Sequence, residues 1–167
     1  GLGDLYINRL QAPDAHLAFD ADPATALRKM FWSYDGATSD ADQSTGFLPP
    51  GVSMLEQVPD RATLPPWMSP EHFADYVAAF TAGGFEGPVN WYRAMDLNWS
   101  LTAFLQGRMI HPPALFIVGE RDPVRHYSGA HEAGMADWLT DLRDRTVIPG
   151  AGHWIQQECP ACRPSCP

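Results

Sequence analysis

Apolar residues recur at helical spacing in the first half of the chain. One such segment, Ala24 to Trp32, follows Asp22, a good N-cap, and Pro23, which fits the first helical position. The segment carries its large apolar residues on one face: Leu27, Met30 and Phe31. The pattern therefore predicts a helix that ends by Gly36.

A second helical pattern is bounded by residues that start and stop helices. Ser69 can cap it, Pro70 can open it, and the pair Gly83-Gly84 can close it. The apolar residues between these limits are Phe73, Tyr76, Val77 and Phe80. The preceding stretch, residues 36–67, is rich in Gly, Pro, Ser and Asp, which predicts a long loop without regular structure.

A third helix is predicted from near Val89 to about Leu101. It contains Trp91 and Trp99, which are eight residues apart. We expect both indoles to pack on one helical face rather than to stack on a ligand.

The pattern changes in the second half of the chain, where residues 114–118 form a short, continuous apolar run after two prolines. Such a run is typical of a buried parallel strand. A helix around residues 131–142 and a second strand at residues 145–148 are expected to follow. The order strand, helix, strand predicts one right-handed crossover unit of an α/β sheet.

Composition excludes some classes of function. The chain has 167 residues, of which 45% are hydrophobic, enough for one core, and a net charge of −9. No cluster of Lys and Arg accompanies that charge, so we expect no nucleic-acid partner. No run of about 18 apolar residues occurs, so we expect no membrane partner and a soluble, cytoplasmic protein.

The three cysteines lie close together at Cys159, Cys162 and Cys166. The first two have the C-x-x-C spacing of zinc and dithiol sites. Three prolines surround them and oppose a helix that would lower a thiol pKa, and a tetrahedral zinc site needs four ligands. We therefore expect neither a metal nor a redox role.

Two polar side chains follow the ends of the two predicted strands: Asp122 after the first and His153 after the second. In an open α/β sheet, ligands bind at the carboxyl ends of the strands. An aspartate that accepts a hydrogen bond from one imidazole nitrogen leaves the other nitrogen free to take a proton. The sequence therefore predicts an Asp122–His153 acid-base pair.

Several segments resemble the soluble epoxide hydrolases of the α/β-hydrolase superfamily. They are GFEGPVNWYRAMDLNW, PALFIVGERD, GAGHWIQQE and the early stretch YINRLQAP. The similarity extends from about Tyr6 to Glu158. It implies a partial α/β-hydrolase fold, with a helical cap over residues 1–105, the C-terminal part of the core over 106–155 and an irregular Cys/Pro tail over 156–167.

The resemblance also implies roles for four residues. Tyr6 and Tyr92 match the two cap tyrosines that donate hydrogen bonds to the epoxide oxygen, where negative charge develops as the ring opens. Asp122 and His153 match the charge-relay pair, with His153 activating the water that hydrolyses an aspartyl ester. The implied activity is hydrolysis of an epoxide to a vicinal diol without a metal or organic cofactor, as in detoxification.

The nucleophilic aspartate of that family is expected on a sharp turn between a strand and a helix. Asp35, in SYDGA, follows a predicted helix instead, so we do not assign it as the nucleophile. The early strands and the oxyanion-hole segment are not found either. We therefore expect the chain to be a C-terminal fragment that is inactive and poorly soluble without an N-terminal half of the core as its partner.

Two alternatives remain open. Another hydrolase of the same scaffold, such as a haloalkane dehalogenase or an esterase, would share Asp122 and His153. Tyr6 and Tyr92 argue against it, because halide release needs no phenols aimed at a developing alkoxide. The other alternative is a catalytically silent remnant or binding module.

Overall fold

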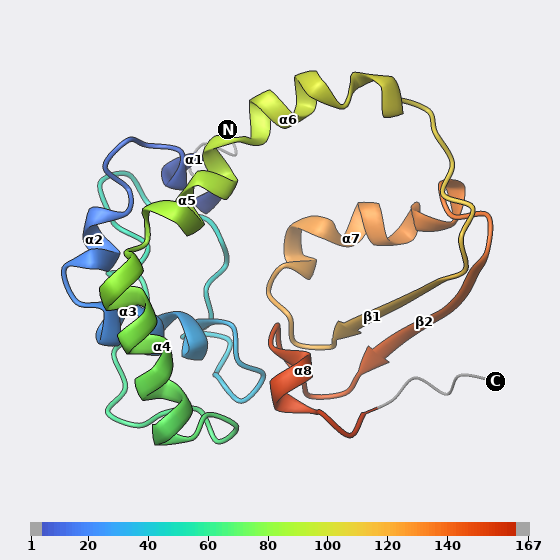
Figure 1. Cartoon of the computed structure of the whole chain (residues 1–167). Coiled ribbons are helices and arrows are strands. Elements are labelled where there is room, and N and C mark those ends of the chain that lie inside the picture. The colour runs from blue at the N-terminus through green and yellow to red at the C-terminus, as the bar shows by residue number, and fades with distance from the viewer. Residues whose placement is uncertain (1–4, 163–167) are drawn as a thin grey trace.

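The computed structural model describes residues 5–162 of the chain. Its helices α1 to α5 gather into one part, and a two-stranded sheet with α7 forms the other (Figure 1). Helix α6 spans the top of Figure 1 between the two parts, and both strands end facing the helical part. The carboxyl ends of the strands, where the sequence places Asp122 and His153, therefore point toward the helices.

The helical part begins with two short helices that the sequence pattern did not predict. They are α1, Tyr6–Leu10, and α2, Leu17–Asp20. Neither has a side-chain cap, and each is too short to show a helical period. Tertiary contacts stabilise them, because Leu10 and Phe19 are buried in the core.

The two capped helices form as predicted. Helix α3 spans Pro23–Ser33, and the Asp22 side chain accepts a hydrogen bond from the Thr25 amide. Helix α4 spans Pro70–Gly83 and is capped by Ser69. The loop between them has neither helix nor strand, as predicted, and is held by isolated contacts such as the Leu5–Phe47 bridge.

The predicted third helix is divided in two. Helix α5 covers Glu86–Arg93, α6 covers Met95–Leu101, and Ala94 ends one and begins the other. A 3-10 turn, Ala103–Leu105, follows. The division separates the two tryptophans, and the expectation that they pack on one face is wrong, because Trp91 is 77% and Trp99 is 83% exposed.

The second part is the strand, helix, strand unit that the sequence predicts. Strand β1, Ala114–Gly119, pairs in parallel with β2, Leu142–Ile148. The connecting helix α7 spans Arg125–Ala133 and a 3-10 turn follows at Met135–Asp137, so the prediction of a helix at 131–142 placed it about six residues too late. Residues 138–141 connect the 3-10 turn to the start of β2 and are therefore not helical.

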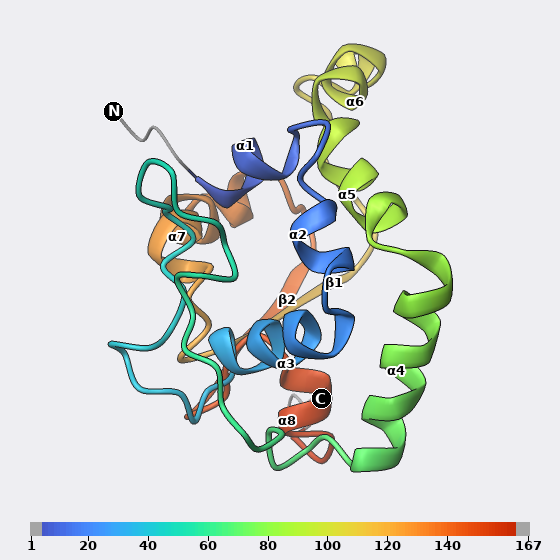
Figure 2. The same ribbon diagram turned by 90° about the vertical axis from the view of Figure 1, so that its left-hand side faces the viewer.

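The core lies mainly in the helical part. Its buried members include Leu27, Phe31 and Tyr34 from α3 and its end, with Phe85 and Val89 near α5. Figure 2, turned by 90°, shows α3 in front of the strands and α4 along the outside. The sheet is less well covered, since Leu115 of β1 and Val147 of β2 are each more than 40% exposed.

The C-terminal segment is more ordered than expected. Helix α8, Ile155–Glu158, includes the first residues of the predicted irregular tail, because the Glu158 carboxylate folds back onto the backbone that precedes this helix. Cys159 and Cys162 form a disulfide. Cys166 lies outside the described residues.

A membrane-spanning helix is not found between residues 5 and 162, where every helix is too short or too polar to cross a bilayer.

Candidate active site

Asp122 lies in the turn that follows β1. Its backbone amide donates to the Gly119 carbonyl at 3.2 Å, and its Oδ1 accepts from the Val124 amide at 2.9 Å. These contacts close a turn in which Pro123 is buried. The turn fixes the carboxylate and leaves Oδ2 for a second partner.

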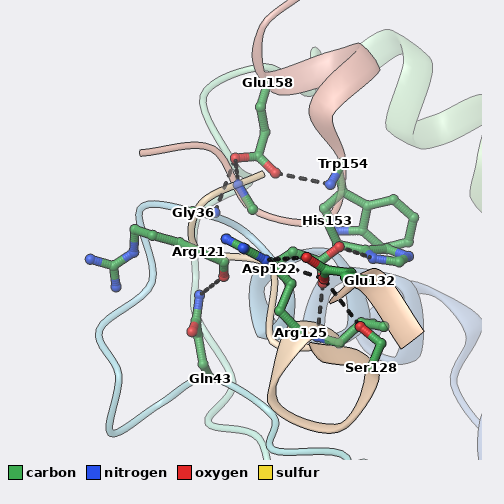
Figure 3. A network of polar contacts seen from close by, with 12 residues as sticks. Gly36, Gln43, Arg121, Asp122, Arg125, Ser128, Glu132, His153, Trp154 and Glu158 are labelled. Carbon is green, nitrogen blue, oxygen red and sulfur yellow. Dashed lines mark hydrogen bonds and ion pairs between the residues drawn. The ribbon is translucent and has the colours of Figure 1, made fainter. Parts of the chain in front are cut away.

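That partner is His153, in the loop that follows β2. Its Nδ1 lies 3.0 Å from Asp122 Oδ2, and the Asp122 side chain is only 11% exposed (Figure 3). A carboxylate accepts hydrogen bonds, so the proton of the neutral imidazole belongs on Nδ1 and Nε2 is left as the acceptor. The predicted pairing of Asp122 with His153 is thus present in the structure.

Close backbone packing positions the His153 loop. The His153 amide donates to the Tyr34 carbonyl at 2.9 Å, immediately after α3. A Cβ atom at Gly152 would lie 2.8 Å from the Asp35 carbonyl carbon and would meet the Gly36 amide as well. Only glycine permits this approach, so the end of α3 and the loop after β2 are held together at the level of the backbone.

Glu158 adds a charged anchor to the same loop. Its Oε2 accepts from the amides of Gly152 at 2.8 Å and Gly36 at 3.0 Å, and its Oε1 accepts from the Trp154 amide at 3.0 Å (Figure 3). Hydrogen bonds to an ionised carboxylate are stronger than neutral ones. Sequence reasoning missed this residue, although it lies four residues after Trp154, one turn along α8.

The structure also brings the two predicted tyrosines together. Tyr6 begins α1 and Tyr92 lies in α5, and their ring centroids are 5.9 Å apart in an edge-to-face arrangement. Arg93 holds these elements in register, because its guanidinium donates to the carbonyls of Ala12 at 3.0 Å and Pro13 at 2.8 Å. Arg93 therefore has a structural role.

Burial raises the pKa of the Tyr92 phenol above its ordinary value, and the neighbouring Tyr6 raises it further. The phenol therefore stays protonated and able to donate a hydrogen bond.

Tyr34 connects the phenol pair with the acid-base pair. Its ring centroid lies 5.5 Å from that of His153. Burial is the main cause that raises the pKa of its phenol to about 12; a hydrogen bond with Ser44 opposes this shift, and electrostatic interactions with Tyr6, Tyr92 and Asp122 add to it. Tyr34 thus interacts with all four predicted residues. The sequence pattern gave Tyr34 no role, because it lies just past the end of a helix.

An apolar cavity of about 460 Å³ lies among the helices of the first part. Tyr92 and Trp154, the neighbour of His153, both line it. Other apolar side chains that line it come from five helices: Leu10 of α1, Phe19 of α2, Leu27, Met30 and Phe31 of α3, Phe80 of α4 and Val89 of α5. The cavity suits a small molecule with apolar substituents.

Asp35 is not free for chemistry. It is 2% exposed, and its two carboxylate oxygens accept from the Trp67 indole at 2.6 Å and the Ala37 amide at 2.7 Å. It follows α3 rather than a strand. The Asp35 carboxylate is therefore a buried group that stabilises the loop.

The relatives of the chain are epoxide hydrolases. It is 39% identical to epoxide hydrolase A of Mycobacterium tuberculosis over 159 residues, which are 93% of this chain and 47% of the relative. It is 33% identical to epoxide hydrolase 3 of Siraitia grosvenorii over 163 residues, which are 94% and 49%. The crystal structure of epoxide hydrolase A from Mycobacterium thermoresistibile superposes with a TM-score of 0.83 and 36% identity over 93% of this chain and 48% of that one.

The chain is similar to one half of these epoxide hydrolases, and its structure is consistent with part of their α/β-hydrolase fold. It spans about half the length of the curated relatives that it matches, and the matched half is their C-terminal part. No family model matches it. The parallel pair β1–β2 with its crossover helix is consistent with a part of the α/β-hydrolase fold of these neighbours.

The Asp122–His153 contact can be tested without substrate. We expect Asp122→Asn to switch the neutral imidazole from the Nδ1–H to the Nε2–H tautomer, because the new amide can donate its N–H to Nδ1. The ¹⁵N shifts of the two ring nitrogens report the tautomer directly. An unchanged tautomer would mean that the 3.0 Å contact does not control the proton on His153.

Proposed function

We propose that this chain forms the C-terminal part of the active site of an epoxide hydrolase, an enzyme that adds water to an epoxide to give a vicinal diol. The observation that carries the proposal is the pair of phenols, Tyr6 and Tyr92, gathered around the same buried tyrosine as the Asp122–His153 pair. The similarity to epoxide hydrolases supports it. The proposal assigns residues 1–105 to a cap, 106–155 to the core and 156–167 to a tail.

The proposed reaction starts with a carboxylate from the N-terminal half of the core. It attacks one epoxide carbon, the bond from that carbon to oxygen breaks, and the oxygen gains negative charge. Tyr6 and Tyr92 donate hydrogen bonds to this oxygen, and one of them transfers its proton to it. Donors that act on charge present only in the transition state lower the barrier more than they stabilise bound substrate.

The second step hydrolyses the resulting ester. His153 Nε2 takes a proton from water, and the water oxygen attacks the ester carbonyl carbon while Asp122 stabilises the imidazolium. The ester bond then breaks, the diol leaves, and the carboxylate is restored. The proton on His153 returns through solvent to the tyrosinate. The proposed chemistry uses no metal or organic cofactor.

The apolar cavity supports a small-molecule epoxide with apolar substituents as substrate. A larger hollow of about 880 Å³ is lined by Asp122 and by charged side chains such as Arg125 and Arg145. We favour the apolar cavity because Tyr92 lines it and an epoxide carries no charge. We further propose a detoxifying role in the cytoplasm, since epoxides alkylate cellular nucleophiles and diols do not.

The test uses an assembled enzyme, in which this chain is joined to the N-terminal half of the Mycobacterium tuberculosis epoxide hydrolase A. We expect the assembled enzyme to convert styrene oxide to its diol, and the chain alone is assayed beside it. An assembled enzyme that folds but leaves the epoxide unchanged would refute the proposed function. Release of halide from a haloalkane or hydrolysis of a carboxylic ester in its place would favour another hydrolase of the superfamily.

Tyr92→Phe in the assembled enzyme separates epoxide chemistry from other hydrolysis. We expect ester formation to slow by about 10²-fold, the usual effect of removing one donor to a developing oxyanion. Ester hydrolysis should keep its rate, because the phenol has no part in that step. Rapid-quench measurement of the two steps decides, and an unchanged rate of ester formation would remove Tyr92 from the acid pair.

A further inference from the structure

A fifth chemically relevant group lies beside the four proposed residues: Tyr127, on α7. Its hydroxyl oxygen is buried, and within residues 5–162 no hydrogen bond of good geometry reaches it. A buried hydroxyl without a partner is costly, so its position needs an explanation. Its ring packs edge-to-face on Phe47 with 6.3 Å between centroids, which helps to hold the ring in place.

The backbone places this phenol against Tyr6. Leu5 pairs with Phe47 in an antiparallel bridge, and the Tyr6 amide donates to the Gly46 carbonyl at 2.7 Å. A Cβ atom at Gly46 would lie 3.1 Å from Cε1 of Tyr127 and 3.4 Å from Cδ1 of Tyr6. Gly46 therefore lies between the two rings, and its φ of 76° is one that glycine adopts without strain.

The neighbourhood of the hydroxyl shows which group it serves. Burial is the largest cause that raises the pKa of the Tyr127 phenol, and the Tyr6 hydroxyl beside it is the next. Tyr34 and Asp122 raise this pKa further. Tyr127 thus stays protonated at neutral pH, and Tyr6 is the neighbouring group with the largest effect on this pKa. A group in this state can act only as a hydrogen-bond donor or acceptor.

We propose that Tyr127 is a positioning residue for the acid pair: its hydroxyl donates to Tyr6 Oη and thereby directs the Tyr6 hydroxyl hydrogen toward the epoxide oxygen. This inference rests on the proposed function. The Tyr6 oxygen has two lone pairs and one hydrogen, so a donor from Tyr127 occupies a lone pair and leaves the hydrogen for the substrate. Hydrogen bonds in such a chain also polarise one another, which makes Tyr6 a better donor.

The effect belongs to one chemical step. When the epoxide opens, Tyr6 donates a stronger hydrogen bond to the epoxide oxygen or transfers its proton to it, and negative charge grows on Tyr6 Oη. A donor held beside Oη by the packing of its ring stabilises that charge. Tyr127 itself neither touches the epoxide nor transfers a proton. Its contribution therefore passes through Tyr6 and should vanish when the Tyr6 hydroxyl is removed.

The test measures Tyr127→Phe in the assembled enzyme. This variant keeps the ring on Phe47 and removes only a buried hydroxyl, so the melting temperature should be retained or raised. We expect the rate constant of ester formation to fall about five-fold, the size of one neutral hydrogen bond. The dissociation constant of the substrate and the rate constant of ester hydrolysis should stay the same, and a change confined to either of them would contradict the proposal.

A double-mutant cycle distinguishes positioning from a structural effect. In a Tyr6→Phe background, Tyr127→Phe should have no further effect, while in a Tyr92→Phe background it should keep its five-fold effect. A full effect in the Tyr6→Phe background would show that Tyr127 acts directly on the substrate or only on the fold, and would overturn the inference. If the unmodified assembled enzyme hydrolyses the epoxide and Tyr127→Phe forms the ester at the same rate, the role of Tyr127 is overturned. The proposed function would then still stand. No turnover by the unmodified assembled enzyme refutes the proposed function, and this inference with it.

Discussion

His153→Gln should trap the ester in the assembled enzyme. The side chain of glutamine can still donate to Asp122, but it offers no nitrogen that takes a proton from water at neutral pH. We expect ester hydrolysis to slow by about 10³-fold, within the usual contribution of a general base, while ester formation continues. Intact-protein mass spectrometry should therefore show a mass gain equal to one substrate molecule.

His131→Gln is the matched control for this experiment. His131 is exposed on α7 and lies outside the site, so neither step should change. A His153→Gln enzyme that turns over normally, or that loses ester formation and ester hydrolysis equally, would contradict the assignment of His153 as the base. The trapped ester would also locate the nucleophile, because proteolysis and peptide sequencing would identify the modified carboxylate.

Glu158→Ala should have the second largest effect, and we expect it mainly as a loss of stability. The carboxylate accepts three backbone hydrogen bonds, and its loss leaves the amides of Gly36, Gly152 and Trp154 without an acceptor. Because the side chain is partly exposed, water can accept some of the hydrogen bonds that the carboxylate loses. We expect a loss of about 3 kcal/mol in the free energy of unfolding. That corresponds to about 10 °C in melting temperature for a domain of this size.

The same substitution should also slow ester hydrolysis by about ten-fold, because the loop that holds His153 loses an anchor and the imidazole loses its orientation. Glu120→Ala is a matched control, since the exposed Glu120 carboxylate accepts one hydrogen bond from Gly150 in the same loop at 2.9 Å. We expect its cost to stay below about 1 kcal/mol, with ester hydrolysis unchanged. Equal losses of stability in the two variants would show that Glu158 does not stabilise the His153 loop more than Glu120 does.

The elements with strong local signals were predictable. Helices α3 and α4 have an Asp or Ser cap, a proline at the first position and an apolar period of 3.6, and each of these signals lies within a few residues. The apolar run of β1 and its parallel pairing with β2 were likewise accessible from the pattern. Helix α1 was not, because five residues cannot display a period, and neither was the division at Ala94, which lacks any breaking residue.

The candidate site divides in a similar way. Asp122 and His153 could be predicted because each follows a strand, and the ends of parallel strands meet at one edge. Tyr6 and Tyr92 came from a resemblance, since 85 residues of loop and helix lie between them and no local pattern relates them. The roles of Glu158, Tyr34 and Tyr127 became visible only in the three-dimensional structure.

The sequence by itself determined the capped helices, the parallel strand pair and the two polar residues that end its strands, because short-range stereochemistry and periodicity encode them. Only the tertiary structure decided that Tyr6 meets Tyr92, that Glu158 binds the His153 loop, and that Tyr127 lies beside Tyr6. These contacts depend on how close two distant backbones approach, as at Gly46 and Gly152. That distance results from the packing of the whole chain, and no local run of residues specifies it.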